Sequence, residues 1–180
     1  VPGQDVGADG PPPARADVVV IGGGITGASA AYWLGAHGIS AVVLEARGLA
    51  GGASGRNGGH ISPGTAERFS EACKRYGQTR ARAIWEFSHR CADAVRGFVT
   101  EHGVECELRI TGSVSLALTD AELAQVEDTA ASLTSLGVAV ERWDAATCAA
   151  RTRSRSFLGG VRRTTAGQLW PARLVVPMAK

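Results

Sequence analysis

The chain has 180 residues, which suggests one domain or one and a half. Hydrophobic residues make up 44% and charged residues 20%, an ordinary globular composition that excludes a wholly disordered chain, a coiled coil or a collagen-like repeat. The net charge of +2 gives no argument for a nucleic acid or an anionic membrane as partner, and no apolar run is long enough for a transmembrane helix. The four cysteines form no CxxC pair, so we expect reduced, buried thiols, no metal site and a cytoplasmic protein.

The first elements along the chain form a βαβ pattern. Residues 1–16 are rich in proline and glycine and predict a disordered leader. The apolar residues 17–21 run into a glycine cluster, which predicts a buried strand that ends in a turn. A helix over residues 25–37, ended by Gly38, and a strand over 40–44 complete the unit.

Three glycines, Gly22, Gly24 and Gly27, form a G-x-G-x-x-G pattern where the first strand turns into the helix. The first permits the tight turn, the second lets a pyrophosphate approach the backbone, and the third lets helix and strand pack closely. The helix, which begins at Ile25, presents free N–H groups and a partial positive charge to the phosphates. Glu45 follows the second strand, where its carboxylate can accept hydrogen bonds from ribose hydroxyls and disfavours the 2′-phosphate of NADP. The pattern predicts dinucleotide binding but does not separate NAD from FAD.

A loop rich in glycine, serine and asparagine occupies residues 48–64. A simple NAD dehydrogenase needs no long glycine-rich loop after its second strand. A flavin enzyme can use one, because exposed backbone N–H groups reach the pyrophosphate and the flavin edge. Arg56 and Asn57 add side-chain donors, and the loop therefore favours FAD.

The middle of the chain predicts helices followed by a hairpin. Residues 65–102 have helical spacing of apolar residues, and Gly77 can split them into two helices. Residues 107–110 and 113–118 predict two strands joined across Thr111-Gly112. The aromatic residues of the helical stretch are expected in the core, namely Trp85, Phe87 and Phe98.

Two helix caps organise the next stretch. Thr119 and Glu122 have the spacing of a capping box, so a helix is expected from there to Gly137. A strand is expected over residues 138–142. Asp144 then caps a short helix.

The last forty residues contain several arginines and two informative prolines. Residues 151–156 are basic and polar, and a solvated loop is expected there, with a phosphate-binding patch as the alternative and a nucleic-acid contact as a weaker one. Pro171 is placed to open a helix. Pro177 is expected to interrupt that helix.

Several motifs together resemble the N-terminal part of the D-amino-acid-oxidase-like (DAO) FAD-dependent oxidoreductases. The most specific are VVVIGGGITGASAAYWL, VVLEAR and GGASGRNGGHISPG. The branch that the sequence resembles is that of the amine and amino-acid oxidases, which includes gamma-glutamylputrescine, sarcosine and glycine oxidases. The stretches TGSVSLALTDAELAQVEDTAASLTSLGVAVERWDAAT and AGQLWPARLVVPMAK are similar to the family's substrate domain and to its return to the FAD domain.

The resemblance implies FAD as cofactor and oxidation of a C–N bond in an amine or amino acid, with hydride transfer to the flavin. It makes His60 the candidate catalytic residue, although a loop histidine bonded to the backbone is the alternative. Trp170 is a candidate for the substrate pocket, with ordinary packing as the alternative. The implied cofactor contacts are Gly22, Gly24, Ile25, Gly27, Glu45, Arg47, Ser54, Arg56, Asn57, Gly58 and Gly59.

The predicted fold class is α/β, an incomplete Rossmann-type βαβ unit followed by part of an α+β substrate domain. Two alternatives remain open: a truncated, inactive fragment that retains no FAD, since family members are much longer, and an NAD-linked binding domain. No nucleic acid or membrane is expected as partner. The predicted segments are a leader (1–16), the FAD-binding unit with its loop (17–65), a helical segment (66–105), a partial substrate domain (106–165) and a return segment (166–180).

Overall fold

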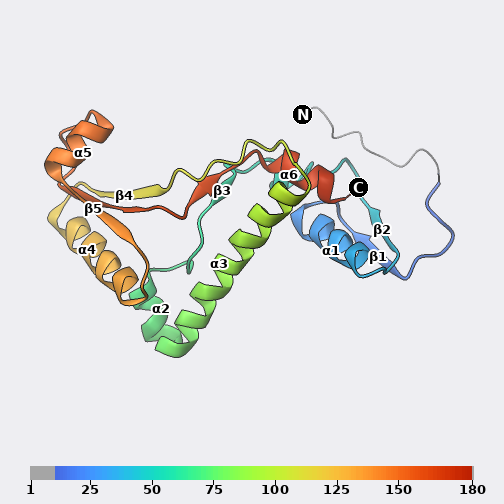
Figure 1. Cartoon of the computed structure of the whole chain (residues 1–180), viewed down its shortest axis with the longest axis horizontal. Helices are drawn as coiled ribbons and strands as arrows, with labels where there is room; N and C mark the ends of the chain where they lie inside the picture. Colours follow the sequence, from blue (N-terminus) through green and yellow to red (C-terminus); the bar gives the residue numbers. More distant parts are fainter. Residues whose placement is uncertain (1–10, 180) are drawn as a thin grey trace. The chain divides into compact units, whose positions relative to one another are not determined.

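The computed structural model of the chain describes residues 11–179 and divides them into two units (Figure 1). The first unit contains the described residues up to 60, residues 97–108, and those from 168 onward. The second unit contains residues 61–96 and 109–167. Most of the predicted leader, residues 1–10, lies outside the described residues.

A parallel βαβ unit opens the first unit, because two short apolar runs flank a glycine turn and a helix. β1 (Val18–Ile21) pairs in parallel with β2 (Ala41–Leu44), so that Val18 lies opposite Ala41 and Ile21 opposite Leu44. α1 (Ile25–Ala36) connects the two strands. Gly38 follows the C-cap with φ of +73°, a conformation that glycine adopts without steric cost. The predicted mixed α/β fold with its strand, helix and strand is confirmed. The expectation that the first strand is buried is wrong, because Val19 is 55% and Ile21 is 88% exposed.

The first unit also contains a 3₁₀ turn, η1 (Ala53–Gly55), and the last helix, α6 (Pro171–Met178). α6 packs against both α1 and η1. Pro171 opens α6 as predicted. The prediction for Pro177 is wrong, because α6 includes this residue and ends one position later. A proline in the last turn removes a single backbone hydrogen bond, which a helix that is about to end tolerates.

The second unit is built on a three-stranded antiparallel sheet. Its strands are β4 (Ser113–Ala117), β5 (Val140–Asp144) and β6 (Gly159–Arg163), with β6 in the centre. The register places Gly159 between Ala117 of β4 and Asp144 of β5. β5 begins two residues later than predicted, and β6 was not predicted at all.

The predicted hairpin across Thr111-Gly112 is wrong, because β4 pairs with β6 and not with residues 107–110. Gly112 has φ of +83° and donates its N–H to the carbonyl of Ala166 at 2.8 Å. The pairing also suits the glycines of β6, since a Cβ on Gly160 would lie 2.8 Å from the Leu116 side chain. Two other short strands, β3 (His60–Ile61) and β7 (Gly167–Gln168), pair with each other.

The helices lie close to where the sequence predicted, although the helical stretch expected from residue 65 begins only at Phe69. α2 (Phe69–Tyr76) and α3 (Gln78–Glu101) are separated by Gly77, whose φ is +79°. α4 (Asp120–Ser135) starts from the capping box, in which both hydrogen bonds between Thr119 and Glu122 are present.

α5 (Ala145–Thr152) follows Asp144, whose carboxylate accepts the Thr147 N–H at 2.7 Å. Hydrogen bonds from Thr147, first that of its side chain and then that of its backbone N–H, hold the pKa of Asp144 below its ordinary value. The cap therefore stays ionised at neutral pH.

Apolar side chains of α4 cover one face of the sheet in the second unit. Val126 and Ala130 pack with Ala117 of β4 and Val161 of β6. At the end of the same helix, Leu133 packs with residues of α2 and α3, namely Phe69, Ala72, Ala81 and Trp85.

Two expectations for buried residues are wrong in part. Phe87 is exposed, because its position on α3 faces away from that core and its ring contacts the Arg90 guanidinium. Cys106 and Cys148 are buried, and burial raises the pKa of both thiols, but Cys91 is exposed and Cys73 is half-buried. Among residues 11–179, no helix combines the length and apolar character needed to cross a bilayer.

Candidate functional site

The turn between β1 and α1 is held by backbone contacts that exclude side chains. Gly22 has φ of +101° and donates its N–H to the carbonyl of Leu44 at 2.8 Å. A Cβ on Gly27 would lie 1.9 Å from the Gly22 carbonyl oxygen, so the first turn of the helix contacts the glycine turn directly. Among residues 11–179, no atom lies within 4 Å of where a Cβ of Gly22 would be, which leaves the backbone open to these residues on that side.

Glu45 lies directly after β2, where its carboxylate contacts the same turn. One oxygen accepts the Gly23 N–H at 2.7 Å and the other accepts the Arg47 N–H at 2.9 Å. These backbone hydrogen bonds, the one from Gly23 first, hold the pKa of Glu45 below its ordinary value. The carboxylate is therefore ionised at neutral pH, and each oxygen retains acceptor capacity for a further donor.

The N-terminus of α1 has its partner in the glycine-rich loop. The Ser54 hydroxyl accepts the Ile25 N–H at 2.9 Å, and it lies 3.0 Å from where a Cβ of Gly24 would be. α1 has no acidic residue in its first turn and no side-chain cap from Gly24. Within the first turn of α1 the free N–H groups therefore meet a neutral hydroxyl and no acidic side chain of the helix itself, an arrangement that suits an incoming anion.

Asn57 fixes the shape of the glycine-rich loop. Its side-chain amide donates to the carbonyls of Ala53 and Ser54, both at 3.0 Å, and its carbonyl oxygen accepts the Gly59 N–H at 2.8 Å. Arg56 is exposed beside it. Asn57 therefore orders the backbone of the loop with both ends of its side chain.

The end of the glycine-rich loop packs against the residues that precede α6. Gly59 has φ of +67°, and a Cβ there would lie 1.9 Å from the Leu169 carbonyl oxygen. The Leu169 N–H in turn donates to the Gly59 carbonyl at 2.9 Å. His60 is exposed, and its ring lies over Gly58, 3.1 Å from where a Cβ of that glycine would be. Gly59 thus leaves room for the backbone of Leu169, and Gly58 leaves room for the imidazole of His60.

Several residues in this site were missed by sequence reasoning. A Cβ on Gly23 would lie 2.6 Å from the Leu49 side chain, and the Gly23 carbonyl accepts the Ala50 N–H at 2.8 Å. Gly55 is equally confined, because its Cβ would lie 2.2 Å from the Ala50 carbonyl oxygen. The available signal for Gly23 was that the middle position of the turn is also glycine, which the G-x-G-x-x-G pattern does not require.

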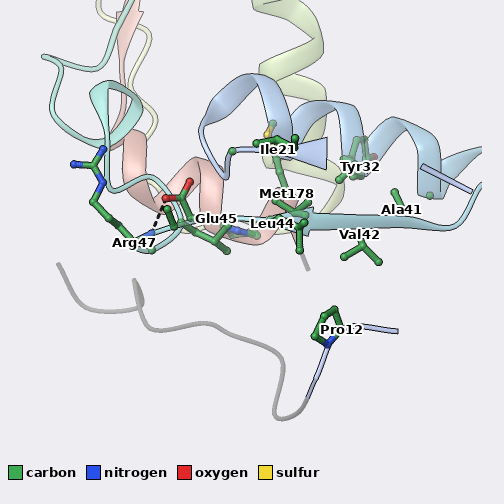
Figure 2. A pocket seen from close by; sticks show the side chains of 18 of the residues that line it. Pro12, Ile21, Tyr32, Ala41, Val42, Leu44, Glu45, Arg47 and Met178 are labelled. Carbon is green, nitrogen blue, oxygen red and sulfur yellow. Dashed lines mark hydrogen bonds between the residues drawn. The ribbon is translucent and has the colours of Figure 1, made fainter. Parts of the chain in front are cut away.

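A hollow of about 1250 Å³ lies beside β2 in the first unit (Figure 2). Gly22 is among its lining residues, and Figure 2 shows Glu45 and Arg47 at one end with Met178 and Tyr32 farther along. Gly24, Ser54 and His60 are not among its lining residues. The hollow is therefore adjacent to the carboxylate that would meet a ribose, whereas the opening of α1 and the loop present an exposed surface of N–H groups.

Trp170 is packed differently from a residue that faces a pocket. Its ring lies 4.1 Å from the Arg173 guanidinium carbon, and Arg173 forms an ion pair with Glu107 at 3.2 Å. Its backbone N–H donates to the carbonyl of Cys106 at 2.7 Å. Trp170 is thus part of a surface stack at the start of α6.

The arrangement fits the adenosine and diphosphate part of a dinucleotide. The open backbone at Gly22 and the uncapped opening of α1 suit a pyrophosphate, which bulky or acidic side chains would repel. The ionised Glu45 suits the two hydroxyls of a ribose and opposes a phosphate in their place. All of these groups belong to one unit of the chain.

The profile of one protein family, described as FAD dependent oxidoreductase (DAO), matches residues 17–180. The chain is 30% identical over 161 residues to the gamma-glutamylputrescine oxidoreductase of Escherichia coli, covering 89% of this chain and 38% of that protein. It is also 30% identical over 168 residues to a probable oxidoreductase, OrdL, of Haemophilus influenzae, covering 92% and 39%. The chain therefore spans about two-fifths of the length of these relatives.

Solved structures share the fold at lower sequence identity. An L-amino acid deaminase from Proteus vulgaris superposes with a TM-score of 0.76 at 22% identity, over 98% of this chain and 44% of that one. A glycine oxidase from Bacillus cereus superposes with a TM-score of 0.67 at 22% identity, over 92% and 43%. The mixed α/β fold matches the N-terminal part of such proteins.

Proposed function

This chain belongs to the DAO family of FAD dependent oxidoreductases, and on that premise we propose that it forms the FAD-binding N-terminal part of an enzyme that oxidises the C–N bond of an amine or amino acid. The activities for which two similar proteins are named, a gamma-glutamylputrescine oxidoreductase and an L-amino acid deaminase, support this substrate class. The observation that carries the proposal is the juxtaposition of an ionised Glu45 with the open glycine turn.

In this proposal, each part of the site has a separate binding task. The carboxylate of Glu45 accepts hydrogen bonds from the ribose hydroxyls of FAD, while its own backbone donors keep it ionised and oriented. The backbone at Gly22 and Gly24 approaches the pyrophosphate, together with the N–H groups that open α1. Ser54, which now accepts the Ile25 N–H, exchanges this hydrogen bond for one to a phosphate oxygen.

The glycine-rich loop then orients the flavin end. Asn57 holds the loop backbone in place, and Arg56 supplies a cationic donor from an exposed position. When bound, FAD supplies the redox chemistry by accepting hydride from the carbon next to the substrate nitrogen, which leaves an imine that water hydrolyses. His60 is proposed to lie near the flavin ring, where its imidazole orients substrate or holds a proton.

The experiment that tests the proposal is flavin retention by the 180-residue chain. The purified chain is incubated with FAD and desalted, and its visible absorption spectrum is recorded beside its circular dichroism. Retained flavin absorbance supports the proposal. A folded chain that retains no FAD, or one that binds NADH and not FAD by fluorescence titration, overturns it in favour of an inactive fragment or an NAD-linked domain.

A matched pair of variants locates the binding site. Glu45→Gln removes the charged acceptor and is expected to weaken FAD binding roughly tenfold to a hundredfold, as expected for loss of a charged hydrogen-bond partner. Glu105→Gln removes an exposed carboxylate of the same unit and is expected to leave FAD affinity unchanged. Equal affinities for both variants would contradict the role assigned to Glu45.

A further inference from the structure

The basic residues of the chain are concentrated near its C-terminal end. Residues 145–180 contain six arginines, one lysine and no acidic residue, whereas the first 144 residues contain twelve basic and seventeen acidic residues. The chain as a whole is therefore nearly neutral, although its segment of residues 145–180 is strongly basic. Such asymmetry is a property of proteins that meet an anionic partner.

Half of these arginines already have neighbours that account for them. Arg162 forms an ion pair with Glu141, and Arg173 forms one with Glu107. Arg163 is half-buried, and burial lowers the pKa of its guanidinium. The three that remain are exposed and take part in no ion pair within residues 11–179; they are Arg151, Arg153 and Arg155.

These three arginines are presented by an ordered stretch of backbone at the end of α5. The Thr152 hydroxyl accepts the Ser154 N–H at 3.2 Å, and the Ser154 hydroxyl accepts the Ser156 N–H at 3.3 Å. Arg153 has φ of +60°, a conformation in which glycine or asparagine is preferred at a helix end. Arg153 therefore places a long cationic side chain at a position where glycine would relieve the backbone strain.

Helix capping explains only part of the arrangement. Arg151 lies in the last turn of α5, where a cation complements the helix dipole, and its guanidinium carbon is 6.0 Å from the Trp143 ring centre. Arg155 lies beyond the helix and beyond the reach of that effect. Its exposure is therefore unexplained by the stability of α5.

Exposed leucines lie at the same end of the sheet. Leu118 follows β4 and is 54% exposed, and Leu158 precedes β6 and is 40% exposed. The Leu158 N–H donates to the carbonyl of Ala117 at 2.8 Å, which places the two leucines side by side. Figure 1 shows α5 beyond this end of β4 and β5.

Acidic groups near this end are mostly engaged with backbone. Glu122 accepts the N–H groups of Leu118 and Thr119, and Asp144 accepts that of Thr147. Asp120, in the first turn of α4, is exposed. The surface therefore combines three arginines and two leucines with the carboxylate of Asp120, while Glu122 and Asp144 keep their charge but are held by backbone N–H groups at the starts of α4 and α5.

We propose that this arginine surface, formed by Arg151, Arg153, Arg155, Leu118 and Leu158, binds the phosphate headgroups of an anionic membrane at its periphery. Guanidinium groups match phosphate oxygens with paired donors, and neighbouring leucines suit the boundary between headgroups and acyl chains. Apolar contacts of this kind contribute little on a nucleic-acid backbone, which favours lipid over a duplex. This inference goes beyond the proposed function and does not depend on it.

The test measures co-sedimentation of the 180-residue chain with two kinds of vesicle. Vesicles of phosphatidylcholine containing phosphatidylglycerol are expected to bind the chain, and binding is expected to weaken as salt is raised. Vesicles of phosphatidylcholine alone are expected not to bind. The triple variant Arg151→Ser, Arg153→Ser, Arg155→Ser is expected to lose roughly a hundredfold in affinity, at the usual contribution of each arginine near an anionic surface.

Matched variants make the result specific to this surface. Arg75→Ser, Arg80→Ser and Arg90→Ser together remove the same charge from exposed positions of the same unit and are expected to preserve binding. Lysine at positions 151, 153 and 155 is expected to restore most of the binding, which also shows that the serine variant is not merely unfolded. Leu118→Ser with Leu158→Ser is expected to lower affinity several-fold without changing the dependence on salt.

Three outcomes would overturn the proposal. Equal losses in the two triple variants would mean that only total charge matters. Equal binding to both kinds of vesicle would exclude headgroup recognition. Binding to polyglutamate or to duplex DNA, in the absence of binding to anionic vesicles, would assign the surface to an acidic protein or to a nucleic acid.

Discussion

The glycine turn of the first unit and the sheet of the second unit are each stabilised by a different kind of contact. At the turn, backbone meets backbone, and a Cβ on Gly27 would lie 1.9 Å from the Gly22 carbonyl oxygen. The strand beside the turn exposes its apolar side chains, with Ile21 88% exposed. In the sheet, side chains fill the contact, with Val161 of β6 and Leu133 of α4 almost fully buried.

The difference shows which kind of substitution each region tolerates. The turn depends on glycines whose missing side chains let backbone segments meet. Adding a methyl group there is therefore expected to disturb the turn more than removing a methyl group nearby. The sheet is specified by apolar volume, so a lost methyl group is expected to leave a cavity. Substitutions in the turn should therefore affect cofactor binding, and those in the sheet should affect stability.

The largest expected effect is that of Gly27→Ala. The new methyl group overlaps the Gly22 carbonyl, so α1 must move away from the turn, at a cost of roughly 3 kcal/mol in the free energy of unfolding. We expect FAD retention, measured by absorbance after desalting, to be lost. Gly35→Ala is the control in the same helix, because its Cβ meets no atom within 4 Å and alanine favours helix by about 1 kcal/mol.

If the Gly35→Ala variant lost FAD retention as fully as the Gly27→Ala variant, the result would contradict this account. The effect would then reflect helix composition and not the close contact.

Leu133→Ala tests the other side of the comparison. Removing a side chain that is 1% exposed is expected to lower the free energy of unfolding by about 3 kcal/mol, measured by urea denaturation. Leu118→Ala, at an exposed position, is expected to cost well under 1 kcal/mol. If Leu133→Ala were instead nearly neutral, the core of the second unit would not be the source of its stability.

The capping box of α4 gives a smaller expected effect. Thr119→Ala removes the hydroxyl that accepts the Glu122 N–H and is expected to cost about 1 kcal/mol. Thr129→Ala, in the middle of the same helix, removes a hydroxyl bonded only to the carbonyl one turn before it and is expected to be neutral or slightly stabilising. Equal losses for the two threonines in urea denaturation would exclude a specific cap.

The smallest expected effect is a dependence on pH in the second unit. Burial lowers the pKa of His89, Arg96 and Arg163 lower it further, and Asp93 partly opposes them. The unfolded chain therefore binds a proton at His89 more readily than the folded chain does. Stability should be fully present above about pH 6.5 and should fall as the pH drops below it.

Urea midpoints measured from about pH 7.5 down to about pH 5.5 check this sign. His89→Gln is expected to flatten that part of the profile. A midpoint that rose on acidification would contradict the account.

The sequence predicted what depends on neighbouring residues. The turn at Gly22, the break at Gly77, the capping box of Thr119 and the cap at Asp144 all act within a few residues, so their spacing is sufficient. The family was likewise recognisable from contiguous motifs around the glycine turn and its loop. The roles assigned to Glu45, Ser54 and His60 remain predictions, although the structure brings the first two to the turn.

Tertiary structure alone decided the strand pairing and the close contacts between distant segments. β4 could have paired with residues 107–110, but β6 supplies a full ladder and, at Gly160, room for the Leu116 side chain of β4. The confinement of Gly23 by Leu49 and of Gly59 by Leu169 is equally invisible in the sequence. Local spacing determines turns and caps, whereas the partner of a strand or the neighbour of a glycine depends on residues far along the chain, whose position only the folded backbone sets.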